Sequence, residues 1–356
     1  MTNCWTPERA HAWFQAQPWL VGCNFTPSNA INQLEMWQAN TFDLSTIDRE
    51  LALAASLGMN AARVFLHDLL WLEDSTAFLG RIDAFLAVAA HHNIRVMLVL
   101  FDSCWHPEPA LGPQPQPREG VHNSGWVQSP GMPVLENRNE HWRLGAYLRD
   151  VVGRFGQDPR VLAWDIWNEP DNGPEVALCD PVALKAKADL VVPLLVAAFG
   201  WAREMEPMQP LTSGIWLGDW SAPDLLSPIQ RAQTGHSDVI SFHNYGIAED
   251  FDQRVKWLKA MGRPLLCTEF MARPAGSTFE AILPVAKEHG VGTFCWGLVR
   301  GKTQTHLPWD KWENPNPQGA KDRWFHDIFD EHGVPHDEKE VEFLRLLNRV
   351  DNKPAV

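Results

Sequence analysis

Eight short segments rich in β-favouring residues recur along this chain of 356 residues, and helical periodicity separates most of them. They span residues 20–26, 60–66, 95–102, 161–169, 210–217, 239–245, 264–270 and 292–299. Regular alternation of strands and helices is typical of parallel α/β proteins, and eight such units can close a barrel. We therefore predict an α/β fold with a single (β/α)8 TIM barrel domain over residues 1–356, preceded by a short helical extension at residues 2–19.

A doubly wound open sheet is the alternative fold that the same alternation allows. Nucleotide-binding folds of this kind carry a glycine-rich phosphate loop after the first strand, whereas this chain has Cys23-Asn24-Phe25-Thr26-Pro27 at that place. The proline-rich stretch 107–117 lies inside one strand-to-helix loop, so it indicates a stiff loop rather than a domain boundary. The first observation favours the barrel over the open sheet, and the second favours a single domain.

Composition argues against several classes of partner and site. The net charge of -14 comes without a basic patch, which argues against a nucleic acid or an anionic membrane as partner. The 6 cysteines are scattered, with no CxxC pair or Cys/His cluster at zinc spacing, so we expect reduced thiols, no metal and no cofactor. Because no signal peptide and no membrane-spanning run are evident, we expect a cytoplasmic protein. The sequence does not indicate an oligomeric state.

Long loops follow the first, third and eighth predicted strands, at residues 27–41, 103–134 and 300–320. In a barrel, all three rise from the rim where the carboxyl ends of the strands meet. The loops contain Trp37, Trp105, Trp126, Trp309 and Trp312, in a chain with 18 Trp and only 2 Tyr. Long loops gathered on one face are typical of a binding role, and the flat face of Trp suits a sugar ring. We therefore expect a walled pocket at this rim.

Polar and aromatic residues stand at or near the ends of the predicted strands. This set comprises Arg63, Asp102, Asn168, Glu169, His243, Tyr245, Glu269 and Trp296. Glu169 and Glu269 belong to the fourth and seventh segments, so they face each other across the mouth of an eight-stranded ring. Cleavage of a glycosidic bond requires such a pair, one acid to protonate the leaving oxygen and one carboxylate to attack the anomeric carbon.

The same residues carry a resemblance to a known family. The matching stretches are Asn60-Ala61-Ala62-Arg63-Val64-Phe65, Trp167-Asn168-Glu169-Pro170, His243-Asn244-Tyr245, Thr268-Glu269-Phe270 and Trp296. In this order the chain resembles a clan A glycoside hydrolase, most similar to family 5, the cellulase and mannanase family, across essentially all eight segments. The resemblance implies a retaining O-glycosyl hydrolase with Glu169 as acid/base and Glu269 as nucleophile. The family often has a His close to the end of strand three, whereas His106 lies four residues beyond Asp102, so its role stays open.

The neighbours of the two carboxyl groups are candidate substrate-binding residues. We expect Arg63 and Tyr245 to hold Glu269 ionised, because opposite charge and hydrogen bonds to the charged form lower a carboxyl pKa. Asn168 is suited to bonding a sugar 2-hydroxyl, or it is a strand-end amide bonded to backbone. Trp296 is either the floor under the reacting sugar or part of the barrel packing.

Further candidates for hydroxyl or ring contacts come from the rim and its loops. They are Glu35, Trp37, Asp102, Trp105, His122, Trp126 and His243. Each has a structural alternative, because loop polar residues are often solvated and a strand-end histidine can be buried for packing. The roles of His67 and Asp68 are left open.

The expected substrate is a β-linked carbohydrate, a gluco- or manno-configured oligosaccharide with a β-1,4 linkage as default, cleaved by double displacement. A stiff wall on the rim favours a pocket that trims short oligosaccharides or chain ends. The alternative is an endo-acting β-glucanase, mannanase or xylanase with an open cleft. Two other classes remain, a non-catalytic carbohydrate-binding barrel and a metal-dependent hydrolase, although the first strand offers no metal-ligand pair. Hydrolysis and transglycosylation are not distinguished.

Overall fold

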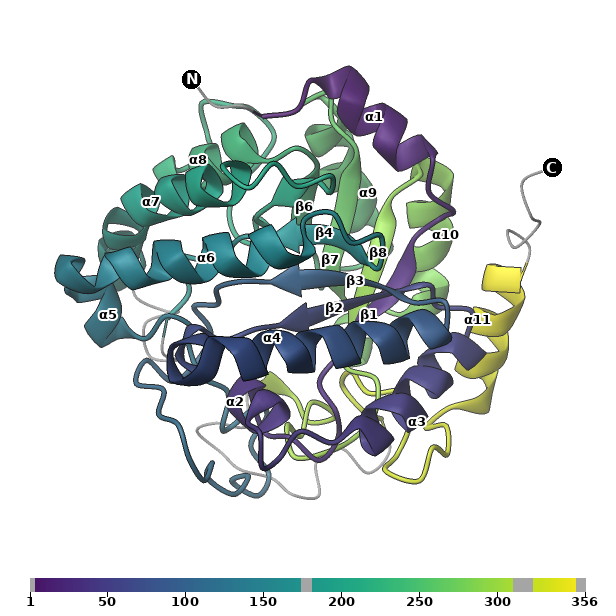
Figure 1. The fold of residues 1–356 in the computed structure, drawn as a ribbon. Coiled ribbons are helices and arrows are strands. Elements are labelled where there is room, and N and C mark those ends of the chain that lie inside the picture. Colours follow the sequence, from purple (N-terminus) through teal and green to yellow (C-terminus); the bar gives the residue numbers. More distant parts are fainter. Residues whose placement is uncertain (1–3, 174–180, 310–322, 350–356) are drawn as a thin grey trace.

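The computed structural model describes residues 4–173, 181–309 and 323–349, and its centre is one sheet of eight parallel strands. The strands are β1 (Val21–Asn24), β2 (Ala61–Phe65), β3 (Arg95–Val99), β4 (Val161–Asp165), β5 (Leu211–Thr212), β6 (Ile240–His243), β7 (Leu265–Phe270) and β8 (Gly292–Trp296). Each predicted segment contains one strand, and helices surround the sheet (Figure 1), so the predicted (β/α)8 barrel is confirmed.

The barrel closes between β5 and β6, the two ends of the strand order β5-β4-β3-β2-β1-β8-β7-β6. Ile215, just beyond the short β5, joins them: its amide nitrogen lies 3.1 Å from the carbonyl oxygen of Ser241, and its own carbonyl oxygen lies 2.9 Å from the amide nitrogen of His243. The hydroxyl oxygens of Thr212 and Ser241 lie 2.7 Å apart. Closure brings the ends of all eight strands to a common rim.

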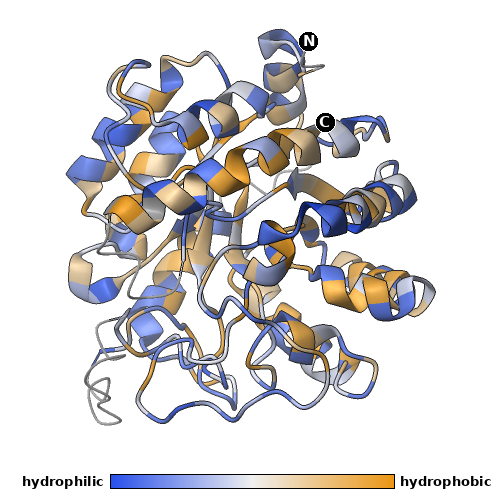
Figure 2. Cartoon of the chain, turned by 90° about the vertical axis from the view of Figure 1, so that its left-hand side faces the viewer, coloured by the Kyte–Doolittle hydropathy of each residue, from blue (hydrophilic) through white to orange (hydrophobic). Residues whose placement is uncertain are grey.

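The helices cover the outside of the barrel and bury their apolar faces on it. Their bounds are α1 (Pro7–Gln15), α2 (Gln33–Trp37), α3 (Leu44–Ser56), α4 (Asp68–His91), α5 (Met132–Glu136), α6 (His141–Phe155), α7 (Pro181–Arg203), α8 (Pro228–His236), α9 (Ala248–Lys259), α10 (Phe279–His289) and α11 (Glu338–Arg349), with 3-10 turns η1 (Arg138–Glu140) and η3 (Arg273–Ala275). Hydrophobic and hydrophilic residues alternate along most helices (Figure 2), as expected for elements with one buried face. None of the helices in the described ranges combines the length and the apolar character that crossing a membrane requires.

Helix α1 occupies most of the predicted N-terminal extension, and the side chain of Thr6 caps its first turn. Trp13 and Phe14 pack against a small core cluster formed by residues near the beginnings of the strands, among them Leu20 and Phe294. The extension therefore covers the end of the barrel opposite the carboxyl rim, away from the predicted site.

The third and eighth loops are bonded to each other at the rim. The backbone nitrogen of Asn123 donates to the carbonyl oxygen of Thr303 at 2.7 Å, and the side chain of Gln304 donates to the carbonyl oxygens of Arg118 and Val121 at 2.7 and 3.0 Å. Residues 310–322 of the predicted eighth loop, including Trp312, lie outside the described residues. The described parts of the two loops form one continuous wall.

Candidate active site

A buried arginine organises the floor of the site. Arg63, in the middle of β2, is 0% exposed and bonds groups from three other strand ends. Its guanidinium donates to Asn24 at 2.8 Å, to Asp165 at 2.8 and 3.0 Å, to Asn168 at 2.6 Å and to Glu269 at 2.8 Å. The planar, permanently charged guanidinium of Arg63 thereby fixes the ends of β1, β4 and β7 relative to each other.

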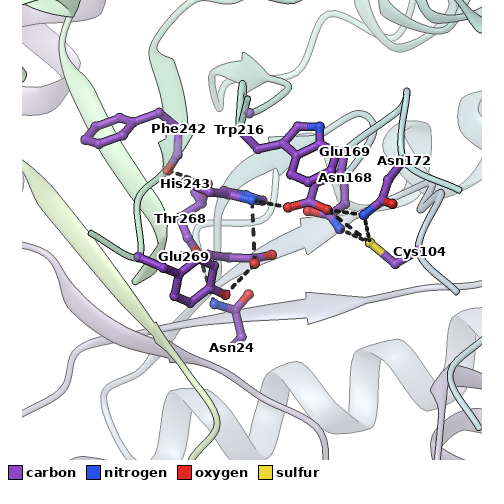
Figure 3. A network of polar contacts seen from close by, with 12 residues as sticks. Asn24, Cys104, Asn168, Glu169, Asn172, Trp216, Phe242, His243, Thr268 and Glu269 are labelled. Atoms are coloured by element: carbon purple, nitrogen blue, oxygen red, sulfur yellow. Dashed lines mark hydrogen bonds and ion pairs between the residues drawn. The ribbon is translucent and has the colours of Figure 1, made fainter. Parts of the chain in front are cut away.

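The two carboxyl groups predicted to face each other do so across an imidazole ring. His243 Nδ1 lies 2.7 Å from Glu169 Oε1 and 3.5 Å from Glu269 Oε2, as Figure 3 shows. A carboxyl oxygen of Glu169 and one of Glu269 lie within 4.8 Å of each other. This separation is close to the roughly 5 Å at which a second carboxylate attacks directly, and it is shorter than the roughly 6.5–9.5 Å typical of an inverting pair.

Glu169 has the environment of a proton donor. It lies just beyond β4 with φ at +41°, a backbone conformation that non-glycine residues rarely adopt, which turns its side chain into the site. Burial raises the pKa of Glu169 to about 7, although hydrogen bonds from Asn172 Nδ2 at 2.5 Å and from the Cys104 thiol at 3.4 Å act in the opposite direction. At neutral pH a substantial fraction of Glu169 therefore carries the proton that a leaving oxygen needs.

Glu269 has the environment of a carboxylate. Arg63 donates to its Oε1 at 2.8 Å, and the Tyr245 hydroxyl donates to its Oε2 at 2.8 Å, so the expected contacts are present. The expectation that they lower its pKa overall is wrong, because burial raises the pKa of Glu269 and outweighs the opposing effects of His243, Arg63 and Tyr245. Of the two acids, only Glu269 is in direct contact with a cation among the described residues, so the negative charge is better stabilised there.

His243 is neutral in this arrangement. Burial lowers the pKa of His243 to about 4, and its Nε2 is buried without a hydrogen-bond partner in the described residues. Glu169, His243 and Glu269 also have ligand types that could hold a metal ion. The Arg63 guanidinium at 2.8 Å from Glu269 repels a cation at this place, which makes the trio better suited to proton transfer and covalent attack.

The carboxyl pair opens into a cavity of about 430 Å3, the size of a small-molecule site. The predicted residues that line it are Trp105, His122, Trp126, Asn168, Glu169, His243, Tyr245, Glu269, Trp296 and Trp309. Four of these are Trp from loops or strand ends, so the expected aromatic walls are present around the acids. Whether each of these side chains binds sugar stays a prediction.

Four of the predicted substrate-binding residues lie outside the cavity lining, and their side chains are engaged elsewhere. Trp37 is 0% exposed, and its indole donates to the carbonyl oxygen of Phe65 within the aromatic core. Glu35 lies outside the lining and is paired with Lys302 at 2.5 Å. Arg63 is fully buried below the carboxylate that it positions.

Asp102 is the fourth of these residues and also acts from behind the cavity. It accepts hydrogen bonds from Trp126 Nε1 at 2.6 Å, from Asn168 Nδ2 at 3.0 Å and from Gln33 Nε2 at 3.1 Å. Burial raises the pKa of Asp102 to about 6. It therefore orients two lining residues instead of touching a ligand.

The residues whose roles were left open are structural in their described contacts. Asp68 is buried, pairs with Arg143 at 2.6 Å and accepts a hydrogen bond from Ser129 of the third loop at 2.9 Å. His67 caps α4 through Nδ1. His106 is exposed and bonds the carbonyl oxygen of Ser124 through Nε2 at 2.9 Å. These contacts hold the base of the third loop.

Several lining residues were missed by the sequence reasoning. Asn172 follows Glu169 by three residues and bonds it (Figure 3). Trp216 follows β5, and its indole donates a 2.8 Å hydrogen bond to Asp171. Cys104 lies against Glu169, with its thiol 3.4 Å from Glu169 Oε2. Their positions in the sequence could have indicated this role, because polar and aromatic residues just after the ends of β3, β4 and β5 lie on the rim.

The chain is similar to known glycoside hydrolases both in sequence and in fold. The family Cellulase (glycosyl hydrolase family 5) matches residues 17–301. Among solved structures, an exo-β-1,4-mannosidase from Opitutaceae bacterium strain TAV5 is 21% identical with a TM-score of 0.62, and the match covers 95% of this chain and 61% of that one. The chain thus spans about three fifths of that enzyme.

Two further structures share the fold at lower identity. A variant of a family 5 glycoside hydrolase from Streptomyces cattleya, in complex with Manβ1-4GlcNAc, is 14% identical with a TM-score of 0.62, covering 95% of this chain and 82% of that one. The β-mannanase of the blue mussel Mytilus edulis is 17% identical with a TM-score of 0.57, covering 82% and 89%. No curated protein matches the sequence. The family match spans most of the barrel, and the chain belongs to glycosyl hydrolase family 5.

Proposed function

We propose that Glu169 is the acid/base and Glu269 the nucleophile of a double displacement that releases the terminal sugar from short β-linked oligosaccharides. The observation that carries this proposal is the pair of buried carboxyl groups, with oxygens within 4.8 Å of each other, in a cavity lined largely by aromatic side chains. Of the two acids, Glu269 is the one paired with a guanidinium within the described ranges, and the pKa of Glu169 is raised to about 7, which supports these two roles.

The chemistry proceeds in two steps through these groups. Glu269 attacks the anomeric carbon while Glu169 gives its proton to the glycosidic oxygen, so the leaving sugar departs and a glycosyl ester of Glu269 forms. Glu169, now a carboxylate, takes a proton from a water molecule that attacks the same carbon. The ester bond breaks, Glu269 is free again, and the product keeps the β configuration.

The substrate proposed is a gluco- or manno-configured sugar in a β-1,4 linkage, with the mannoside as the first candidate. The structural neighbours named as mannosidase and mannanase support the mannoside. Trp296 and Trp126, whose ring centroids lie 6.1 Å apart, provide apolar faces beside Glu269 for either sugar. Asn168, next to the acid, remains the candidate for the 2-hydroxyl contact that separates the two configurations.

An exo-acting pocket is favoured over an open cleft by the joined loops. His122, Asn123 and Trp126 of the third loop and Trp309 of the eighth line one side of the cavity, and the hydrogen bonds between the loops hold this wall in place. A wall on one side blocks the passage of a continuing chain. A cytoplasmic location, which would supply short imported oligosaccharides, stays a prediction.

Product analysis tests the mode of cleavage. On β-1,4-mannohexaose and on soluble mannan or β-glucan, the enzyme is expected to release monosaccharide from the first minutes, with little loss of viscosity, because only chain ends enter a blocked pocket. Chromatography of early products and viscometry measure both. A rapid fall in viscosity before much reducing sugar appears would instead identify the endo-acting alternative.

The pH dependence should report the proton on Glu169. Because the pKa of Glu169 is raised to about 7, this proton is present below that pH and is lost above it, so kcat/KM falls as pH rises through about 7. The fall is expected for an alkyl or sugar leaving group and should be much weaker for 2,4-dinitrophenol, which leaves without protonation. If kcat/KM fell equally with rising pH for both kinds of substrate, the assignment of Glu169 as the acid would be contradicted.

A further inference from the structure

Two neighbouring residues of the third loop, His122 and Asn123, form a polar patch in the otherwise aromatic wall of the cavity. Both are only 1% exposed. A chain of ring contacts joins the patch to Glu269: the centroid of the His122 ring lies 5.4 Å from that of His326, which lies 5.7 Å from that of Tyr245, and the Tyr245 hydroxyl bonds Glu269. Neither residue has a part in the acid/base chemistry described above.

The hydrogen bonding of His122 fixes which of its nitrogens faces a ligand. Nδ1 lies 2.8 Å from the carbonyl oxygen of Leu307, and because a carbonyl only accepts, Nδ1 carries the hydrogen. Burial lowers the pKa of His122 to about 4, so the ring is neutral and Nε2 has a free lone pair. Within the described ranges no protein group bonds Nε2. His122 therefore offers the cavity a hydrogen-bond acceptor.

Asn123 has an amide side chain with unused hydrogen-bonding capacity. Its Oδ1 is buried and has no partner among the residues that the structure describes. The backbone, at φ +51°, is held by the 2.7 Å hydrogen bond from the Asn123 nitrogen to Thr303 of the eighth loop. A buried amide left unpaired costs stability, which indicates that a bound group completes its hydrogen bonds.

In a retaining site, one side of the cavity holds the leaving group and the other side holds the sugar that is attacked. The leaving group lies next to the acid, so Trp216, held by Asp171 two residues beyond Glu169, stands on the leaving-group side. The ring that Glu269 attacks extends the other way, toward Trp296 and the third loop. A polar patch on that side meets the hydroxyls of the attacked sugar that are far from its anomeric carbon.

We propose that His122 and Asn123 recognise the free hydroxyls at the non-reducing end of the terminal sugar, His122 Nε2 accepting from one hydroxyl and the Asn123 amide bonding its neighbour. This inference rests on the proposed exo mode and deepens it. A sugar extended at that end presents no free hydroxyl to one of these groups, and its next residue meets the joined loops. The patch thus selects a chain end.

Deoxy sugars test this assignment directly. Aryl β-mannosides and β-glucosides, each as the parent and as the 3-, 4- and 6-deoxy analogues, are compared in the wild type, His122→Phe and Asn123→Ala. The phenylalanine keeps the ring packing against Trp105 and His326. On the parent, each variant is expected to lose about 10- to 100-fold in kcat/KM. On the analogue that lacks the bound hydroxyl, the same variant should differ little from the wild type. His332→Ala, in an exposed turn, is the matched control.

Binding measurements separate this inference from the proposed function. Methyl β-glycosides and their deoxy analogues are titrated into Glu269→Gln protein, with and without His122→Phe or Asn123→Ala, by calorimetry. Binding that is weakened by the variants and by one matching deoxy position supports the patch even if the wild type hydrolyses nothing, a result that would overturn the proposed function alone. Equal losses on every analogue, no loss on any, or no sugar binding at all would overturn the inference. Thermal denaturation of each variant identifies a folding defect, and Asn123→Asp then provides a second test at the same place.

Discussion

Replacing Glu269 by glutamine is expected to lower kcat for an aryl β-glycoside by about 10^4-fold or more. Glutamine keeps the shape of the side chain: its amide oxygen can still accept from Arg63, and its NH2 group can donate to the Tyr245 hydroxyl. The amide does not form the glycosyl ester, however. The measurement is release of the aryl group under saturating substrate, with the protein's circular dichroism as a check of folding.

The matched control for this substitution is Glu35→Gln. Glu35 is also a carboxylate in a rim loop, but it is paired with Lys302 outside the cavity lining, so its replacement should leave kcat within about 2-fold, because the pair is remote from the reacting groups. Substantial activity in Glu269→Gln would remove Glu269 from the nucleophile role. Loss of activity in both variants would mean that the rim loops, and not the charge on Glu269, limit turnover.

Replacing Glu169 by alanine is expected to have an effect that depends on the leaving group. For a poor leaving group such as methanol or a second sugar, kcat/KM should fall by about 10^2- to 10^4-fold, because the departing oxygen is no longer protonated. For 2,4-dinitrophenyl glycosides, kcat/KM should change little, while kcat falls because no base activates the water of the second step. Steady-state kinetics on a series of phenols measures this as a steeper dependence on leaving-group pKa.

Azide gives the decisive readout for Glu169. In Glu169→Ala, azide should restore turnover of the dinitrophenyl substrate by attacking the glycosyl ester of Glu269, and NMR should show a β-glycosyl azide. An α-glycosyl azide would mean that azide attacks the substrate directly in place of a missing nucleophile, and the roles of the two glutamates would be reversed. Asn172→Ala is informative beside it, because it keeps the acid and removes one of its hydrogen-bond donors.

The fold and the two carboxyl groups could be predicted because each strand is marked by a local sequence pattern. The barrel geometry then brings the ends of these strands together at one rim. Each strand is a short apolar run, and the residue just after such a run in a parallel barrel falls on the shared rim. Glu169 and Glu269 follow or end two such runs, so their convergence needed no knowledge of the loops. His243 and Tyr245 were placed by the same rule and line the cavity.

The loop predictions failed where side-chain direction decided the outcome. Trp37 was assigned to an open loop, but residues 33–37 form α2, which turns the indole into the aromatic core. Asp102 lies at the rim, yet it points behind the cavity toward Trp126 and Asn168. Sequence spacing locates a residue along the chain, whereas tertiary packing of a long loop sets where its side chain points.

The lining residues that the sequence did not predict follow strand ends, as the predicted ones do. Trp216 was hidden because the predicted fifth segment, 210–217, is an ordered strand only over Leu211–Thr212, so its end was placed too late. Asn172 and Cys104 act on Glu169 from two different loops. Their contacts depend on how those loops return to the acid, which no local pattern encodes.

The bonds of Arg63 have a consequence for how this enzyme can diverge. Its guanidinium holds Glu269 and Asn168 from inside the barrel through groups that belong to strands or their immediate ends. The groups proposed to meet the rest of the sugar, His122 and Asn123, lie further along the third loop than Cys104, which contacts both Glu169 and Asn168. Neither His122 nor Asn123 bonds Arg63, Glu169 or Glu269 among the described residues. Substitutions around these two positions can therefore accumulate with little effect on the reacting atoms. Mutations that change the preferred substrate can therefore be selected with little effect on catalysis. A substitution of Arg63, in contrast, would disturb the groups that react.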